Sequence, residues 1–150
     1  MLKKKLGAEA IEERIINCHI SWFYKVPPTL IIPEGCRGIR FEVFNCCRKL
    51  KKVIIPGSVK NVGARAFKNC TCLKEVVISD DVEYIGISAF YGCSKLERVV
   101  VPESVEEIGK YAFAWCEDAT IILRKPMSEF KYIGDSAFKW CKNVKEETRN

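Results

Sequence analysis

The chain has 150 residues, of which 48% are hydrophobic and 29% are charged, and its formal net charge at pH 7 is +6. This length and composition predict a single folded domain with a substantial core and exclude an intrinsically disordered chain. No segment approaches the roughly 20 consecutive apolar residues that a membrane-spanning helix requires, so membrane insertion is not expected.

Residues 1–29 are predicted to form an N-terminal helical cap. In the segment LGAEAIEERIINCHI, residues 6–20, apolar positions fall on one side of a helix, and the terminal unit of a stacked protein needs a polar outer face. The basic start MLKKK is followed by acidic residues where a secretory signal peptide would be apolar. We therefore expect a cytoplasmic protein, or a surface-exposed one if the chain is a fragment of a longer secreted protein.

Residues 30–150 are predicted to hold about five stacked repeats of 23 residues. The most regular marker is a phenylalanine that recurs at intervals of 23, 23, 23 and 25 residues, at Phe44, Phe67, Phe90, Phe113 and Phe138. Each unit reads approximately I-G-x-x-A-F-x-x-C-x-x-L-x-x-V-x-I-P-x-S-V-x-x. A fixed period of this length is typical of a solenoid, whose units bury their apolar faces by stacking on one another.

The third repeat indicates the local structure of a unit. Apolar residues of the segment 89–96 are three apart, which predicts a short helical turn. In the segment 98–101 the period changes to two, which predicts a strand with Val99 and Val101 facing the core. Pro102 lacks a backbone donor and is expected to end this strand.

A glycine precedes the helical turn in four units, where a sharp turn with positive φ is expected. These residues are Gly63, Gly86, Gly109 and Gly134. The last two repeats depart from the pattern. In the fourth, Ala119 replaces leucine and two extra residues lie between Leu123 and Ile133; in the fifth, the pattern stops after Val144, where a strand is expected.

This pattern resembles the BspA-like leucine-rich repeats, a treponemal-type class with 23-residue units. The resemblance covers about residues 30–144. It implies an α/β solenoid: a single short right-handed coil with a parallel β-sheet on one face and short helical turns on the other. It also implies a binding or adhesion role without catalysis. The residues that carry the resemblance in the third unit are Ile85-Gly86, Ala89-Phe90, Cys93, Leu96, Val99, Val101-Pro102 and Ser104-Val105.

Nine cysteines raise the question of metal, disulfide or thiol chemistry. The close pairs lack zinc-site spacing, and His19 is the only histidine. Stacked identical positions hold their Cβ atoms about 4.8 Å apart, whereas a relaxed disulfide prefers roughly 3.8 Å. The cysteines in the repeated position are therefore predicted to be buried free thiols, which pack as small hydrophobes. They are Cys47, Cys70, Cys93, Cys116 and Cys141.

No catalytic or cofactor-binding motif occurs in the sequence, so we expect neither an enzyme nor a bound cofactor or metal ion. The expected function is protein–protein interaction, as an adaptor or a stoichiometric inhibitor. The partner would be another protein bound on the strand face of the solenoid. Two columns of outward-facing residues are predicted there: Lys52, Glu75, Arg98 and Ile121, and beside them Ile54, Val77, Val100 and Leu123.

Charge suggests a second kind of partner. Residues 1–74 carry 15 Lys/Arg and 5 Asp/Glu, whereas the remaining residues carry 10 and 14, so positive charge is concentrated in the first half. Nucleic acid or another phosphate-rich partner is therefore an alternative. A fragment of a surface adhesin is a further alternative. The densest basic cluster consists of Arg48, Lys49, Lys51 and Lys52.

Two tryptophans occupy the same position in consecutive units. Trp115 and Trp140 each stand two residues after the repeated phenylalanine and are expected to lie on neighbouring coils, near Tyr91. Tryptophan is enriched in binding hot spots. A pair at this place is also suited to closing the C-terminal end of the solenoid, so both interpretations stay open.

Overall fold

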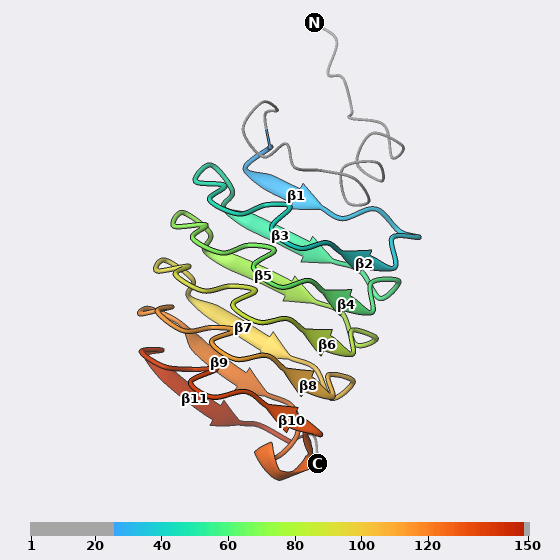
Figure 1. Cartoon of the computed structure of the whole chain (residues 1–150), viewed down its shortest axis with the longest axis vertical. Coiled ribbons are helices and arrows are strands. Elements are labelled where there is room, and N and C mark those ends of the chain that lie inside the picture. The colour runs from blue at the N-terminus through green and yellow to red at the C-terminus, as the bar shows by residue number, and fades with distance from the viewer. Residues whose placement is uncertain (1–25, 149–150) are drawn as a thin grey trace, which may run out of the picture.

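Each repeat contributes strands to two parallel β-sheets, as Figure 1 shows for the computed structural model of the chain, which describes residues 26–148. Sheet A has six strands, in the order β1 (Thr29–Ile31), β3 (Lys52–Ile55), β5 (Glu75–Ile78), β7 (Arg98–Val101), β9 (Thr120–Leu123) and β11 (Asn143–Glu146). Sheet B has five two-residue strands, in the order β10 (Tyr132–Ile133), β8 (Glu107–Ile108), β6 (Tyr84–Ile85), β4 (Asn61–Val62) and β2 (Gly38–Ile39). The predicted solenoid with a parallel sheet is therefore confirmed.

The strands of sheet A form where the sequence alternates. In β7, Val99 and Val101 are fully buried, whereas Arg98 and Val100 lie on the outer face, and the strand ends immediately before Pro102. Sheet B was not expected. Its strands are short because each pairs only the two residues that precede the repeated glycine position.

The predicted helical turns are wrong. Within residues 26–148 the only helix is the 3-10 helix η1 (Met127–Glu129). In the segment 65–69, the amides of Arg65, Phe67 and Asn69 donate to carbonyls of the following coil at 2.7–2.8 Å. Amides used between coils cannot also form the i→i−4 bonds of an α-helix. The three-residue apolar spacing therefore comes from successive tight turns.

Positive φ recurs at two corners of the coil, and the repeated glycines do not occupy them. One corner includes Arg65, with φ of 56°, and the other includes Asn69, with φ of 57°. A left-handed backbone costs a residue other than glycine roughly 1–2 kcal/mol. The conformation is tolerated at each coil because its amide is bonded to the next coil.

The repeated glycines are explained by close approach between coils. A Cβ atom on Gly109 would lie 2.4 Å from the Ile87 amide nitrogen and 2.6 Å from the carbonyl carbon of Gly86. Backbone atoms cannot move aside as a flexible side chain can. The expectation of positive φ at these glycines is therefore wrong, and the requirement is for the absence of a side chain.

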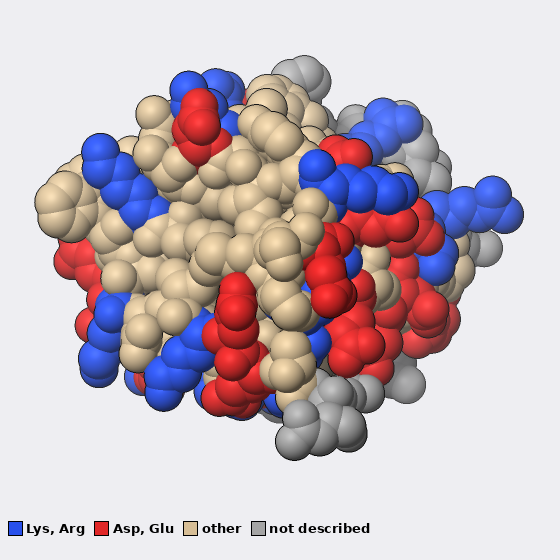
Figure 2. Space-filling view, turned by 90° about the horizontal axis from the view of Figure 1, so that it is seen from below, with Lys and Arg blue, Asp and Glu red and all other residues tan. Residues whose placement is uncertain are grey.

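The core consists of columns of identical side chains. Phe67, Phe90 and Phe113 are fully buried, and their rings stack with centroids 5.3 Å apart. Apolar residues of both sheets and of the turns join them in one continuous cluster. At the end of the solenoid near β11, Phe138 and Val144 are only partly buried, and Figure 2 shows a broad area without charge surrounded by charged side chains.

The predicted N-terminal cap lies outside the described residues, apart from its last few positions, and its helix at 6–20 lies wholly outside them. The fifth repeat, in contrast, is described and corrects an expectation. Residues 143–146 form the strand β11, which pairs with β9 over four residues. The polar sequence Asn-Val-Lys-Glu is compatible with a strand at the end of a sheet, where charged residues are common.

Candidate functional site

The outer face of sheet A brings together most of the predicted site residues. Pairing between neighbouring strands places one column in line, which runs Thr29, Lys52, Glu75, Arg98, Thr120 and Asn143. The column is polar throughout. Its one ion pair joins Lys52 Nζ to Glu75 Oε1 at 2.9 Å, and both side chains remain about a third exposed or more. An exposed pair of this kind adds at most about 1 kcal/mol to stability.

The second column forms an apolar stripe on the same face. The apolar stripe consists of Ile31, Ile54, Val77 and Val100. Ile31 pairs with Ile54 and Ile54 with Val77, while Val100 is the third residue of the next strand. Ile31 is 61% exposed and Val77 38% exposed, and Ile54 and Val100 are half-buried.

Ile121 and Leu123 do not belong to this face, so their predicted place is wrong. Both side chains are fully buried. Strand β9 pairs Thr120 with Arg98, only 22 residues away, because the fourth repeat has one residue fewer before its strand. Side chains alternate along a strand, so a shift of one position exchanges its two faces.

Thr120 and Ile122 take the outward places instead, although Ile122 is only 3% exposed. A signal was present in the sequence. From the start of β7 to the start of β8 there are nine residues, and from β9 to β10 there are twelve. The net gain of two residues therefore conceals a loss of one before β9 and a gain of three after it. The gained residues include the 3-10 helix η1.

The basic cluster is only partly available for binding. Arg48, Lys49 and Lys51 are exposed, whereas Lys52 is paired with Glu75. Cations elsewhere in the first half also meet acidic residues of a neighbouring coil, as Lys60 meets Glu83 at 3.7 Å. The proposal of nucleic-acid binding through this cluster stays a prediction.

The repeated cysteines have a more specific structural role than filling space. Each thiol donates a hydrogen bond to the carbonyl of the phenylalanine one coil earlier, for example from Cys70 to Phe44 at 3.1 Å and from Cys93 to Phe67 at 3.2 Å. Burial raises the pKa of the Cys70 thiol and raises that of Cys93 well above its ordinary range. These groups are protonated donors and poor nucleophiles, since the thiolate is the reactive form.

The buried thiols predict lower stability in alkali. Above about pH 9 the unfolded chain releases thiol protons that the folded chain retains, so rising pH favours unfolding. The free energy of unfolding is expected to fall by about 1.4 kcal/mol per pH unit for each such thiol until the pH reaches the folded pKa. Below about pH 8 the full contribution is present. Urea unfolding at a series of pH values measures this slope.

The control for this prediction is Cys93→Ala, which removes one titrating thiol. Its slope above about pH 9 should be smaller than that of the natural chain by the share of one group. Equal slopes for the two proteins would contradict the proposed origin of the effect.

Comparison with known proteins places this arrangement in a family. The sequence profile of the BspA type leucine-rich repeat region matches residues 21–145, with six copies. The chain belongs to the BspA-type leucine-rich repeat family. Solenoids of this family are typically binding modules without enzymatic activity. A search of curated proteins found no significant match.

Solved structures of this family are similar to the chain over most of its length. A leucine rich cell surface protein of Faecalibacterium prausnitzii is 28% identical, with a TM-score of 0.69, and the match covers 84% of this chain and 34% of that one. A leucine-rich repeat protein of T. pallidum is also 28% identical, with a TM-score of 0.69, covering 75% and 54%. The chain thus spans between a third and about half of the length of these BspA-type relatives.

Location is less well defined than family. The expected cytoplasmic location finds no support among these relatives, one of which is a cell surface protein. Across residues 26–148, no helix has the length and apolar character needed to cross a membrane.

Proposed function

We propose that this chain is a non-catalytic protein-binding module and that it binds its partner through the outer face of sheet A. The observation that supports this function is the apolar stripe. Four aliphatic side chains from consecutive strands stay accessible in a row, beside a column that is polar along its whole length. A contiguous apolar strip with a polar border is typical of a protein contact surface.

The rigidity of this face favours binding. Each residue of the stripe is held in a strand that is hydrogen-bonded to its neighbours, and the inward residues Val53, Val76 and Val99 are almost wholly buried beneath it. A face that is already ordered loses little conformational entropy when a partner binds. The stripe is also a continuous surface because every coil contributes to it in register.

The cell surface is the proposed setting. The described relative from F. prausnitzii is a cell surface protein, and the chain corresponds to about a third of it. In such a setting the module would contribute one binding segment to a longer adhesin-like solenoid. An adaptor or a stoichiometric inhibitor would use the same face in the same way.

Two acidic substitutions test this proposal. The double variant Val77→Asp with Val100→Asp puts two charges in the stripe, which would have to be desolvated beneath a partner. We expect retention of a partner protein by the immobilised chain to fall at least about tenfold, equivalent to 1.4 kcal/mol. The measurement is affinity capture followed by titration of the recovered protein.

Ile87→Asp is the matched control, because Ile87 is 50% exposed and follows the sheet B strand β6. This variant should bind as the natural chain does. If the double variant folds normally and retains the partner, the site is not on sheet A. If the natural chain captures no protein at all, the proposed function is wrong.

A further inference from the structure

Trp115 and Trp140 form an exposed aromatic pair at one corner of the coil. Their ring centroids are 5.7 Å apart with an interplanar angle of 38°, so the predicted contact between neighbouring coils is confirmed. Trp115 is 44% exposed and Trp140 58% exposed. The pair therefore leaves much of its aromatic surface in water, although every phenylalanine of the central column is buried.

The backbone at this corner makes tryptophan an unexpected choice. Trp115 has φ of 62° and Trp140 has φ of 65°, in the left-handed region that favours glycine and asparagine. The two preceding coils follow that preference, with Asn69 and Gly92 at the equivalent position. The fold is thus satisfied by residues without a ring. Strained residues with an exposed, large side chain are a basis for inferring function.

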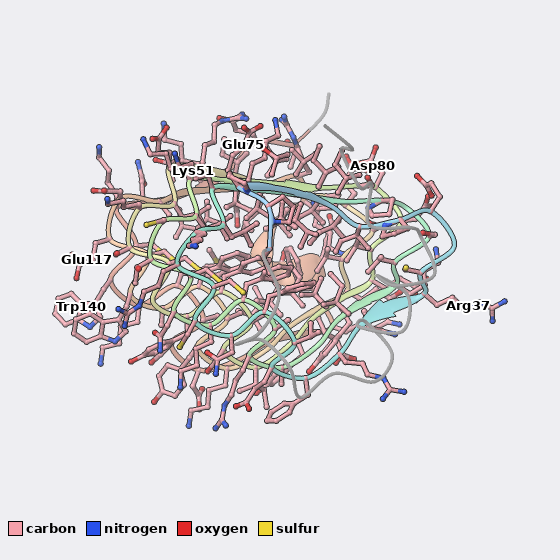
Figure 3. All side chains as sticks on the ribbon, turned by 90° about the horizontal axis from the view of Figure 1, so that it is seen from above. Arg37, Lys51, Glu75, Asp80, Glu117 and Trp140 are labelled. Atoms are coloured by element: carbon pink, nitrogen blue, oxygen red, sulfur yellow. The ribbon has the colours of Figure 1, made fainter. Side chains whose placement is uncertain are left out.

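The surroundings of the pair are polar and nearly balanced in charge. Glu117 and Asp118 follow Trp115 in the same turn, and Lys142 occupies the position of Glu117 in the next coil. Lys139 Nζ lies over the Trp140 ring, 5.9 Å from its centroid. Figure 3 shows Glu117 and Trp140 at the same end of the cross-section, far from the labelled Arg37 at the opposite end. Donors and acceptors therefore border the aromatic surface.

We propose that the Trp115–Trp140 pair binds a neutral carbohydrate, by stacking against the apolar C–H faces of its pyranose rings. Sugars with equatorial substituents, such as β-linked glucose or N-acetylglucosamine, present such faces. Their hydroxyl groups both donate and accept hydrogen bonds, which suits a border of carboxylates and ammonium groups.

Size and charge favour this ligand over the macromolecules. Two tryptophans bury at most about 500 Å², which is less than the roughly 800 Å² that each partner contributes to a standard protein interface. Glu117 and Asp118 beside the rings would repel the phosphates of a nucleic acid. A neutral sugar meets neither difficulty.

Calorimetric titration of the full chain with cellohexaose and with N-acetylchitohexaose tests this site. At least one of the two sugars should bind, and Trp140→Asn should weaken its binding by about tenfold, because one stacking surface is lost. This variant introduces a residue that the second coil already holds at the same φ, so its fold should be retained. Indole N–H resonances provide a second measure, since they should shift on titration.

Phe41→Ala is the matched control, because Phe41 is an exposed aromatic residue at another place in the coil. It should bind the sugar normally, as should the sheet A variant Val77→Asp with Val100→Asp, so this proposal and the proposed function can fail separately. Absence of binding by both sugars, or equal binding by Trp140→Asn, would overturn the assignment. So would binding of an oligothymidylate that Trp140→Asn abolishes, which would identify a nucleic-acid site.

Discussion

Replacing Gly109 with alanine is expected to lower the free energy of unfolding by about 3 kcal/mol or more. The new methyl group would have to occupy space 2.4 Å from the Ile87 amide nitrogen and 2.8 Å from its Cα atom. Relief requires separation of two coils that are joined at this point by the bond from the Gly109 amide to the Ile85 carbonyl, at 2.7 Å. Urea unfolding followed by circular dichroism measures the change.

Gly38→Ala provides the control within the same chain. A Cβ atom there would lie 3.5 Å from the Asn61 carbonyl oxygen, an ordinary contact, and Gly38 does not have positive φ. Its effect should be within about 0.5 kcal/mol of the natural stability. Similar effects for the two substitutions would show that close packing of backbone does not explain the repeated glycine.

Phe90→Ala is expected to cost about 4 kcal/mol of stability. The Phe90 side chain is fully buried, and its ring stacks on those of Phe67 and Phe113 with interplanar angles of 4° and 6°. Removal leaves a cavity in the middle of the column, which neighbouring coils cannot fill because their positions are held by both sheets. The transition in urea should move to lower concentration and become less cooperative if the two halves separate.

Phe138→Ala is the matched substitution at the end of the same column. Phe138 is partly buried and stacks on one ring only, with centroids 6.0 Å apart, so its truncation should cost clearly less than that of Phe90. Equal losses at the two positions would contradict a stability that accumulates from contacts between neighbouring coils.

The solenoid could be predicted because its strongest signals are local and repeated. The phenylalanine at position 90 has counterparts 23 residues away on either side, and any arrangement that buries one of them buries the others. The alternation from Arg98 to Val101 defines a strand with one inner face, and the structure confirms it. The nine cysteines include five at the repeated position, and the prediction of buried free thiols is confirmed for Cys70, Cys93 and Cys116.

The candidate site was harder to predict than the fold. A repeat is aligned by its most regular residues, and the loss of one residue before β9 does not disturb the phenylalanine spacing on that side. Ile121 and Leu123 were therefore assigned outward, although both are buried. Along a strand the two faces differ by one position, so this small error exchanged surface and core for the whole strand.

The sequence by itself determined the repeat, its core columns and the family resemblance, because apolar periodicity is a property of neighbouring residues along the chain. Only the tertiary structure decided which strand residues face outward at the fourth repeat, why the glycine at 109 is needed and why Trp115 is strained. Each of these depends on contacts between coils, and residues some 23 positions apart meet at distances that local spacing does not specify. The thiol of Cys93, bonded to the carbonyl of Phe67 in the preceding coil, is a further example.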